Sequence, residues 1–218
     1  MLKRQRLQIA IDGVAGSGKT TIAKKLANYL GFYHFSTGNI FRSFALILHN
    51  ETSFEPKKVK KQIKKANLKI MKNKIILNGK NVTNLLFDPK ISKIASLISG
   101  QKYVRKKYQK MIKKISKQEK IILDGRDIGT VILPKAKYKF FFVASPEIRA
   151  KRRLEQLKLS LSKLKKTIDA IKKRDIEDTK RSISPLKPAK DAIIINTSKL
   201  TITKVFDFVV KNINECKK

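Results

Sequence analysis

The sequence predicts an α/β fold, in which a parallel β-sheet carries helices on both of its faces. Short apolar runs alternate with longer segments of helical periodicity along the chain, which is typical of such a sheet. A glycine-rich loop, residues 13–18, joins the first apolar run to the first periodic segment. An Asn-Gly pair at Asn78 and Gly79 predicts a tight turn between two short runs, and hence a small antiparallel insert.

The expected strands are short apolar runs bounded by polar residues or glycine, and they span residues 7–12, 32–35, 68–71, 75–77, 120–123, 138–143 and 192–196. The expected helices place apolar residues three and four positions apart. They span residues 19–30, 38–49, 57–66, 89–98, 102–117, 146–159, 162–174 and 201–212. Gly31 is expected to end the first helix, and Ser145 to cap the helix that begins at Pro146.

The length of 218 residues, with 41% hydrophobic and 31% charged residues, predicts one folded domain, residues 1–218. Its apolar runs fall short of the roughly 20 residues that a membrane-spanning helix needs. The single cysteine, Cys216, excludes a disulfide within the chain and a cysteine-based metal cage. We therefore expect a cytoplasmic protein with no membrane partner and no structural metal.

The formal net charge of +36 has two interpretations, a nucleic-acid-binding surface or a compositional bias. The chain has 42 lysines and 10 arginines, and its abundant residues have A/T-rich codons. The lysines are spread from Lys3 to Lys218, whereas a nucleic-acid-binding protein would concentrate them on one face. Compositional bias is therefore favoured, and we expect no specific nucleic-acid partner.

The glycine-rich loop matches the phosphate-binding pattern G-x4-G-K-[ST], with a strand before it and a helix after it. Glycines let backbone N–H groups converge on phosphate oxygens, and the helix N-terminus adds positive charge. Lys19 would reach the β- and γ-phosphates, and the Thr20 hydroxyl would hold Mg²⁺. The motif predicts a nucleoside triphosphate ligand bound by Gly13, Val14, Ala15, Gly16, Ser17, Gly18, Lys19, Thr20 and Thr21.

A second motif follows the expected strand 120–123, where ligands of an open parallel sheet gather. Asp124 is placed to orient Mg²⁺ or its waters. Arg126 is suited to grip a phosphate, and Asp127 to accept hydrogen bonds from an amine. The alternative for this segment is a tight turn with a surface Arg–Asp pair.

A third group comprises Arg174, Asp178 and Arg181, whose spacings of four and three place them on one helical face. Two guanidinium groups around a carboxylate suit a phosphorylated sugar, whereas the alternative is a helical salt-bridge ladder. Arg149, Arg152 and Arg153 begin another helix, and a helical lid at about 149–175 could bring such cations to a transferring phosphoryl group.

Together these motifs resemble bacterial cytidylate kinases, a family of P-loop nucleoside monophosphate kinases. The resemblance runs nearly end to end, through Ile11-Asp12-Gly13 to Lys19-Thr20-Thr21, Ser36-Thr37-Gly38-Asn39-Ile40-Phe41-Arg42, Leu123-Asp124-Gly125-Arg126-Asp127-Ile128-Gly129-Thr130, Arg174–Arg181, Pro185-Leu186 and Pro188-Ala189-Lys190-Asp191-Ala192. Two residues depart from the family pattern. Val14 stands where proline is usual, and Glu177 where a basic residue is frequent.

The resemblance implies transfer of the γ-phosphoryl group of ATP to CMP or dCMP, with Mg²⁺, by a monomer. It implies an acceptor phosphate held by Arg42, Arg126 and Arg181. It further implies a cytosine ring read by Ser96, Arg105 and Asp127, and a sugar held by Arg174 and Asp178. Thr37 precedes the acceptor-site glycine, and residues 54–100 correspond to an inserted acceptor-binding subdomain.

Catalysis is expected from Lys19, Asp124, Arg126 and Arg181, with Arg149 and Arg153 on the ATP side. UMP or AMP is the alternative acceptor, but uracil lacks the amine that Asp127 would bind. A basic nucleic-acid-binding protein that holds ATP is the alternative from another class.

Overall fold

The computed structural model describes residues 7–71 and 74–215, and Cys216 lies outside them. The chain forms two compact units. The first combines the segment up to His34 with the segment from Ser116 onward, and the second comprises Phe35–Ile115.

The first unit is built on a five-stranded sheet in the order β2-β6-β1-β7-β8. The pairs β1–β6, β1–β7 and β7–β8 are parallel, which confirms the predicted fold class. The strands are β1 (Leu7–Gly13), β2 (Tyr33–Ser36), β6 (Lys120–Gly125), β7 (Tyr138–Val143) and β8 (Ile193–Asn196). Because β1 and β6 are adjacent and parallel, the segments that follow them start at the same edge of the sheet.

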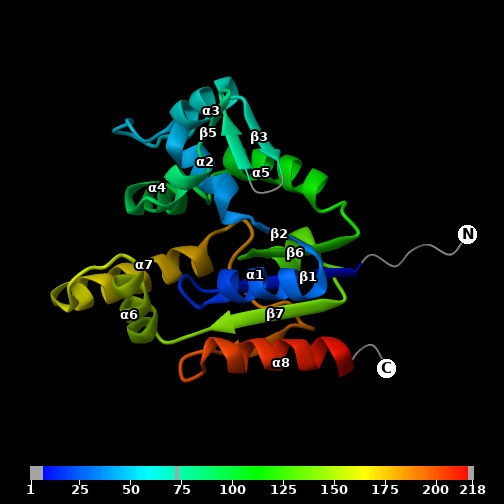
Figure 1. Cartoon of the computed structure of the whole chain (residues 1–218). Coiled ribbons are helices and arrows are strands. Elements are labelled where there is room, and N and C mark those ends of the chain that lie inside the picture. The colour runs from blue at the N-terminus through cyan, green and yellow to red at the C-terminus, as the bar shows by residue number, and fades with distance from the viewer. Residues whose placement is uncertain (1–6, 72–73, 216–218) are drawn as a thin grey trace, which may run out of the picture. The chain divides into compact units, whose positions relative to one another are not determined.

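Four helices accompany this sheet, namely α1 (Lys19–Leu30), α6 (Pro146–Gln156), α7 (Leu164–Lys180) and α8 (Ile202–Glu215). Figure 1 shows α1 and α8 running alongside the strands. Gly31 ends α1 in the left-handed conformation, as expected. Ser145 caps α6, because its side chain accepts a hydrogen bond from the Ile148 N–H.

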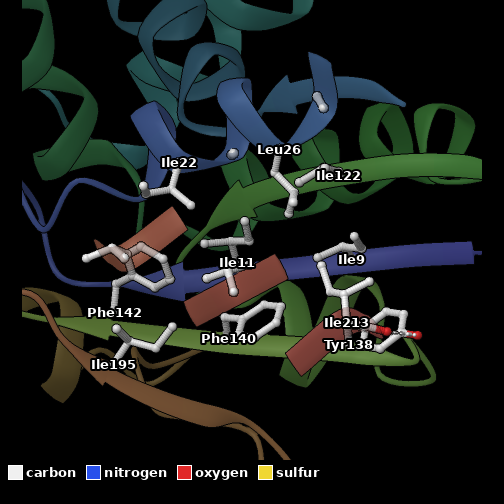
Figure 2. Packing of buried hydrophobic residues seen from close by; sticks show 14 residues of the cluster. Ile9, Ile11, Ile22, Leu26, Ile122, Tyr138, Phe140, Phe142, Ile195 and Ile213 are labelled. Carbon is white, nitrogen blue, oxygen red and sulfur yellow. Dashed lines mark hydrogen bonds between the residues drawn. The ribbon is translucent and has the colours of Figure 1, made fainter. Parts of the chain in front are cut away.

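The main hydrophobic core lies between β1, β7, α1 and α8 (Figure 2). Ile9 and Ile11 of β1 belong to this core, together with Phe140 of β7. The intervening Ala10 is equally buried, so β1 is covered on both faces, as a central parallel strand requires. The Tyr138 hydroxyl donates a 3.0 Å hydrogen bond to the Ile213 carbonyl and thereby ties β7 to the end of α8.

The second unit combines helices with the small antiparallel sheet β3-β4-β5. Its elements are α2 (Gly38–Ile47), α3 (Pro56–Lys65), β3 (Leu68–Met71), β4 (Lys74–Leu77), β5 (Lys80–Asn81), the helical turn η1 (Thr83–Phe87), α4 (Pro89–Ile98) and α5 (Lys102–Ile115). The predicted turn is present, since Asn78 and Gly79 both have positive φ, 50° and 83°. It joins β4 to β5, a two-residue strand that the apolar pattern did not indicate.

Several predicted boundaries were wrong. The helix expected at 162–174 begins at Leu164, because Ser160 caps a separate turn, η3 (Leu161–Lys163), ahead of it. The helix also continues beyond its expected end, to Lys180. The helix expected at 38–49 ends at Ile47, where the Leu48 and His49 amides turn back to carbonyls three residues earlier. The turn η2 (Ile128–Ile132) was not predicted at all.

The close approach of Gly13 to β7 yields a stability prediction. A Cβ at position 13 would lie 2.1 Å from the Phe142 carbonyl oxygen, and its φ is +145°. A Cβ at Gly79 would meet nothing within 4 Å, and only its φ of +83° opposes a side chain. We expect Gly13→Ala to lower the free energy of unfolding by roughly 4 kcal/mol or more. The control Gly79→Ala should cost about 1 kcal/mol. Chemical denaturation measures both values, and equal losses would contradict the packing described here.

Candidate active site

The glycine-rich loop passes from β1 to α1 and encloses the side chain of Lys19. The Lys19 Nζ donates a 3.0 Å hydrogen bond to the Val14 carbonyl, and the Ser17 hydroxyl donates to the same oxygen at 2.9 Å. Gly16 and Gly18 take positive φ values of 76° and 87°, which allow the loop to turn tightly before the helix. Phosphate binding by this loop stays a prediction.

Lys19 lies in an unusual electrostatic environment for a lysine. Its side chain is buried, and burial is the main reason why its pKa lies well below the ordinary value. The positive charges of Arg126 and Arg174 lower the pKa further, while Asp124 and Asp12 oppose this. Lys19 therefore shares an electrostatic environment with arginines from two other segments of the first unit.

The side chain of Thr20, in the first turn of α1, contacts that of Asp124, near the end of β6. The Thr20 hydroxyl donates a 2.8 Å hydrogen bond to Asp124 Oδ2, and His34 Nε2 lies 2.7 Å from Asp124 Oδ1. Burial would raise the pKa of Asp124, but the hydrogen bond and charge of His34, together with Lys19 and Thr20, hold it below the ordinary value. An ionised carboxylate beside a hydroxyl is a set of hard oxygen donors, and these residues therefore fit Mg²⁺.

Arg126 and Arg181 converge on Asp178. Arg126 Nε donates to Asp178 Oδ2 at 2.8 Å, and Arg181 Nη1 lies 3.5 Å from Oδ1. Arg181 Nε also donates to the Ser184 carbonyl at 2.5 Å. Burial would raise the pKa of Asp178, but the charges of Arg126, Arg174 and Arg181 and the Arg126 hydrogen bond hold it below its ordinary value. The predicted group is therefore a buried charge cluster between β6 and α7.

The second unit carries the other predicted acceptor residues. The Arg105 side chain is buried, its Nε donates to the Ser99 carbonyl at 2.6 Å, and its guanidinium lies over the rings of Phe41 and Tyr108 at 4.8 and 5.7 Å. The two rings stack with centroids 4.5 Å apart, so Arg105 is held in an aromatic cradle.

Arg42, Thr37 and Ser96 lie in the same unit as Arg105. Arg42 Nη1 donates to Asn39 Oδ1 at 3.2 Å, and its guanidinium lies 5.9 Å from the centre of the Phe87 ring. Thr37 is buried directly ahead of α2. Among the described residues, no hydrogen-bond partner meets the buried Ser96 hydroxyl, which leaves it able to bind a ligand.

Arg149 and Arg153, expected on the ATP side, differ in their surroundings. The Arg149 side chain is buried, and it donates to the carbonyls of Ala144 at 2.9 Å and Ala15 at 3.1 Å and to the Asp175 carboxylate. Arg149 thus links the glycine-rich loop to α7. Arg153 is only half-buried, with a 3.3 Å hydrogen bond to Gln156, and direct ATP contacts by both arginines stay predictions.

Sequence reasoning missed three contributors to this arrangement. No motif of the sequence indicated a role for His34, yet it contacts Asp124 from a neighbouring strand. Asp12 and Phe41 stood in motifs of the family resemblance without an assigned role, and Tyr108 stood in none. The position of Asp12, directly before the glycine-rich loop, was the one available signal.

A phosphate-binding loop and a strand-end carboxylate on a parallel sheet define a P-loop phosphotransferase class. Solved structures agree on the fold. An uncharacterised protein from Eubacterium ventriosum matches with a TM-score of 0.53 and 17% identity, covering 96% of this chain and 99% of that one. The shikimate kinase of Bacteroides thetaiotaomicron matches with a TM-score of 0.52 and 12% identity, covering 96% and 97%.

Sequence comparison identifies the family within this class. The family model for cytidylate kinase matches residues 9–215. The cytidylate kinases of Clostridium botulinum (strain Hall) and Mycoplasma genitalium are each 40% identical, covering 92% and 97% of this chain and 94% and 97% of their own. That of Thermosipho melanesiensis is 39% identical, covering 96% and 98%. The chain therefore belongs to the cytidylate kinase family, and the predicted resemblance and kinase class are confirmed.

Within residues 7–71 and 74–215, no helix is long and apolar enough to cross a membrane.

From the buried charge cluster around Asp178 we predict that the stability of the protein depends on pH. Asp178→Asn leaves two buried guanidinium groups without their counter-charge, so we expect a loss of roughly 3 kcal/mol at pH 7. Because the pKa of Asp178 is lowered on folding, its stabilising effect is present above the ordinary value of 3.8 and is lost as the pH falls below it.

Urea denaturation at several pH values would therefore show a difference between wild type and variant that shrinks below about pH 4. Asp169→Asn, at an exposed position of the same helix, is the control and should change little. A difference that persists at low pH would show that the charge is not the cause.

Proposed function

We propose that the chain transfers the γ-phosphoryl group of ATP to CMP and dCMP, producing ADP and CDP or dCDP. Membership of the cytidylate kinase family supports this activity. The observation that carries it is the electrostatic link between the donor and acceptor residues. Arg126 lowers the pKa of Lys19 and also donates a hydrogen bond to Oδ2 of Asp178. Arg181 contacts the other carboxylate oxygen of Asp178, Oδ1. Lys19, predicted for ATP, and Arg126, predicted for the acceptor phosphate, therefore interact electrostatically within the first unit.

On the donor side, the backbone amides of residues 13–18 and the N-terminus of α1 bind the triphosphate. Lys19 provides a buried positive charge for its β- and γ-phosphates. Arg149 holds the loop in place through the Ala15 carbonyl.

Mg²⁺ fits the oxygens of Thr20 and Asp124, which would hold it beside the triphosphate. Bound there, the ion neutralises phosphate charge and orients the transferring group. The chain's own contribution is to keep Asp124 ionised and oriented, through the hydrogen bonds with Thr20 and His34.

On the acceptor side, Arg126 and Arg181, with Arg42, grip the phosphate of the monophosphate, because guanidinium groups match its oxygens in pairs. Asp178 contacts both Arg126 and Arg181 and, together with Arg174, binds the sugar hydroxyls. An oxygen of the acceptor phosphate attacks the γ-phosphorus in line, and the bond from that phosphorus to the β–γ bridging oxygen breaks. The acceptor is already anionic, so no general base and no covalent intermediate are needed. Positioning and charge neutralisation provide the catalysis.

Base recognition falls to Arg105, Asp127 and Ser96. Arg105 donates to the acceptor atoms of cytosine, Asp127 accepts from its amine, and the Ser96 hydroxyl adds a further hydrogen bond. The aromatic cradle of Phe41 and Tyr108 fixes the direction of the Arg105 guanidinium. We also assign acceptor binding to an insert at 54–100 and closure over ATP to a lid at about 149–175, both by family resemblance.

The remaining parts of the proposal concern partners and location. We propose a cytoplasmic monomer whose partners are ATP and CMP or dCMP, with no specific nucleic acid. The even spread of lysines along the chain supports the last point. The alternative of a nucleic-acid-dependent ATPase predicts ATP hydrolysis that RNA or DNA stimulates, and no phosphorylation of any monophosphate.

Lys19→Ala should abolish turnover with CMP and leave the fold intact. The substitution removes the buried charge assigned to the transferring phosphate, whereas the Lys19 side chain makes one hydrogen bond among the described residues, within its own loop. A coupled assay of ADP formation measures the activity, and circular dichroism checks the fold. The exposed Lys24 of α1 provides the control, since Lys24→Ala should behave like wild type. Near-normal activity of Lys19→Ala would exclude the loop from the mechanism.

Arg105→Met should raise the KM for CMP by about tenfold or more and leave the KM for ATP unchanged, because a charged hydrogen bond to the base is lost. In the wild type, CMP and dCMP should be preferred over UMP by about tenfold to a hundredfold for the same reason. Assays with CMP, dCMP, UMP and AMP test both statements. Equal rates with CMP and AMP, or equal effects of Arg105→Met on both KM values, would contradict the base assignment.

A further inference from the structure

The carboxylate of Asp12 binds two consecutive backbone amides on another segment of the first unit. Asp12 is the next-to-last residue of β1, directly before the glycine-rich loop, and its side chain is only 4% exposed. Its Oδ1 accepts the Ile128 N–H at 2.8 Å, and its Oδ2 accepts the Gly129 N–H at 2.7 Å. A single side chain thus fixes the first turn of η2 to the end of the central strand.

Those two amides directly follow Arg126 and Asp127, the residues assigned to the acceptor phosphate and base. The same Asp12 is also the register partner of Gly125 at the end of β6. Asp12 therefore holds the chain on both sides of the Arg126–Asp127 pair, by strand pairing before it and by its carboxylate after it. Neither residue of the pair can shift by much without breaking one of these contacts.

Burying the Asp12 carboxylate has an energetic cost for the folded state. Burial raises the pKa of Asp12 to about 7, although the Gly129 and Ile128 amides and Lys19 act to lower it, and the negative charge of Asp127 adds to the increase. A buried carboxylate near the negative charge of Asp127 is unfavourable by itself, and the hydrogen bonds from the two amides offset part of this cost. Among the described residues, Arg126 joins the segment between Gly125 and Gly129 to α7 through Asp178, and Asp12 joins it to β1 through two backbone amides.

Gly129 lies between the side chains of Lys139 and Asp12. A Cβ at this position would lie 3.3 Å from Lys139 Cδ and 3.5 Å from Asp12 Oδ2. Lys139 itself is held by the Pro134 carbonyl and by Asp191, each at 2.6 Å, so η2 is enclosed between Asp12 and the Lys139 side chain.

We propose that Asp12 is a positioning residue for the monophosphate site, which fixes Arg126 and Asp127 relative to the glycine-rich loop through the Ile128 and Gly129 amides. This inference rests on the proposed function, since it assigns the pair to the acceptor. Asp12 touches neither substrate and takes no part in the phosphoryl transfer itself.

Asp12→Asn tests the proposal, because an amide of the same shape accepts one of the two N–H groups and presents an N–H to the other. Titration calorimetry measures CMP and ATP separately. We expect the Kd for CMP to rise by about tenfold and the Kd for ATP to stay within about twofold. Amide hydrogen exchange should be faster at Ile128 and Gly129 in the variant, and CMP binding should only partly restore protection.

Asp191→Asn is the matched control. It makes the same chemical change at another carboxylate of the same unit, keeps an oxygen that can accept the hydrogen bond from Lys139, and lies outside the assigned sites. Both Kd values should stay within about twofold of wild type. An equal increase in the CMP Kd for this control would overturn the proposal.

Three results for Asp12→Asn would also overturn it: an unchanged CMP Kd, an equal weakening of CMP and ATP, or unchanged exchange of the two amides. If the variant does not fold, Asp12→Ser is measured in the same way, and failure of both to fold would show that Asp12 serves folding alone. A wild type that does not phosphorylate CMP would instead contradict the proposed function, while the exchange comparison would still report on the Asp12 contact.

Discussion

The chemistry of this chain depends on a set of opposite charges buried at the carboxyl ends of β1 and β6. Burial lowers the pKa of Lys19 most, the charge of Arg126 lowers it further, and Asp124 and Asp12 oppose these effects. Arg126 is itself paired with Asp178. Such a cluster is expensive to bury and contributes little to stability. It is suited to ligands that bring negative charge, because phosphate groups complete the pairing that the protein leaves unbalanced.

The fold that holds this cluster could be predicted to a large extent, because its determinants are local. Apolar runs, helical periodicity and the glycine at position 31 each act within a few residues, and they placed most strands and helices within a few positions. The missed elements depend on distant contacts. The turn η2 is anchored by Asp12, 116 residues away in sequence from Ile128, and no local pattern indicates such a contact.

The residues of the candidate site also fall into two groups, those that a local sequence pattern indicates and those that depend on distant contacts. Lys19, Asp124, Arg126, Asp178 and Arg181 belong to motifs whose residue types imply phosphate chemistry, so sequence reasoning selected them as candidates. His34, Asp12 and the aromatic cradle of Arg105 act through other side chains or through backbone amides. Their roles exist only once β1, β2 and β6 lie side by side, or once α2 and α5 pack, and the sequence shows neither.

The central claim is that the donor and acceptor phosphates bind next to each other, the first at Lys19 and the second at Arg126. A bisubstrate compound, with cytidine and adenosine joined through a chain of five phosphates, tests it most directly. We predict that this compound inhibits phosphoryl transfer competitively with respect to both ATP and CMP, and that Lys19→Ala and Arg126→Met each weaken its binding. Competition with only one of the two nucleotides would contradict the account.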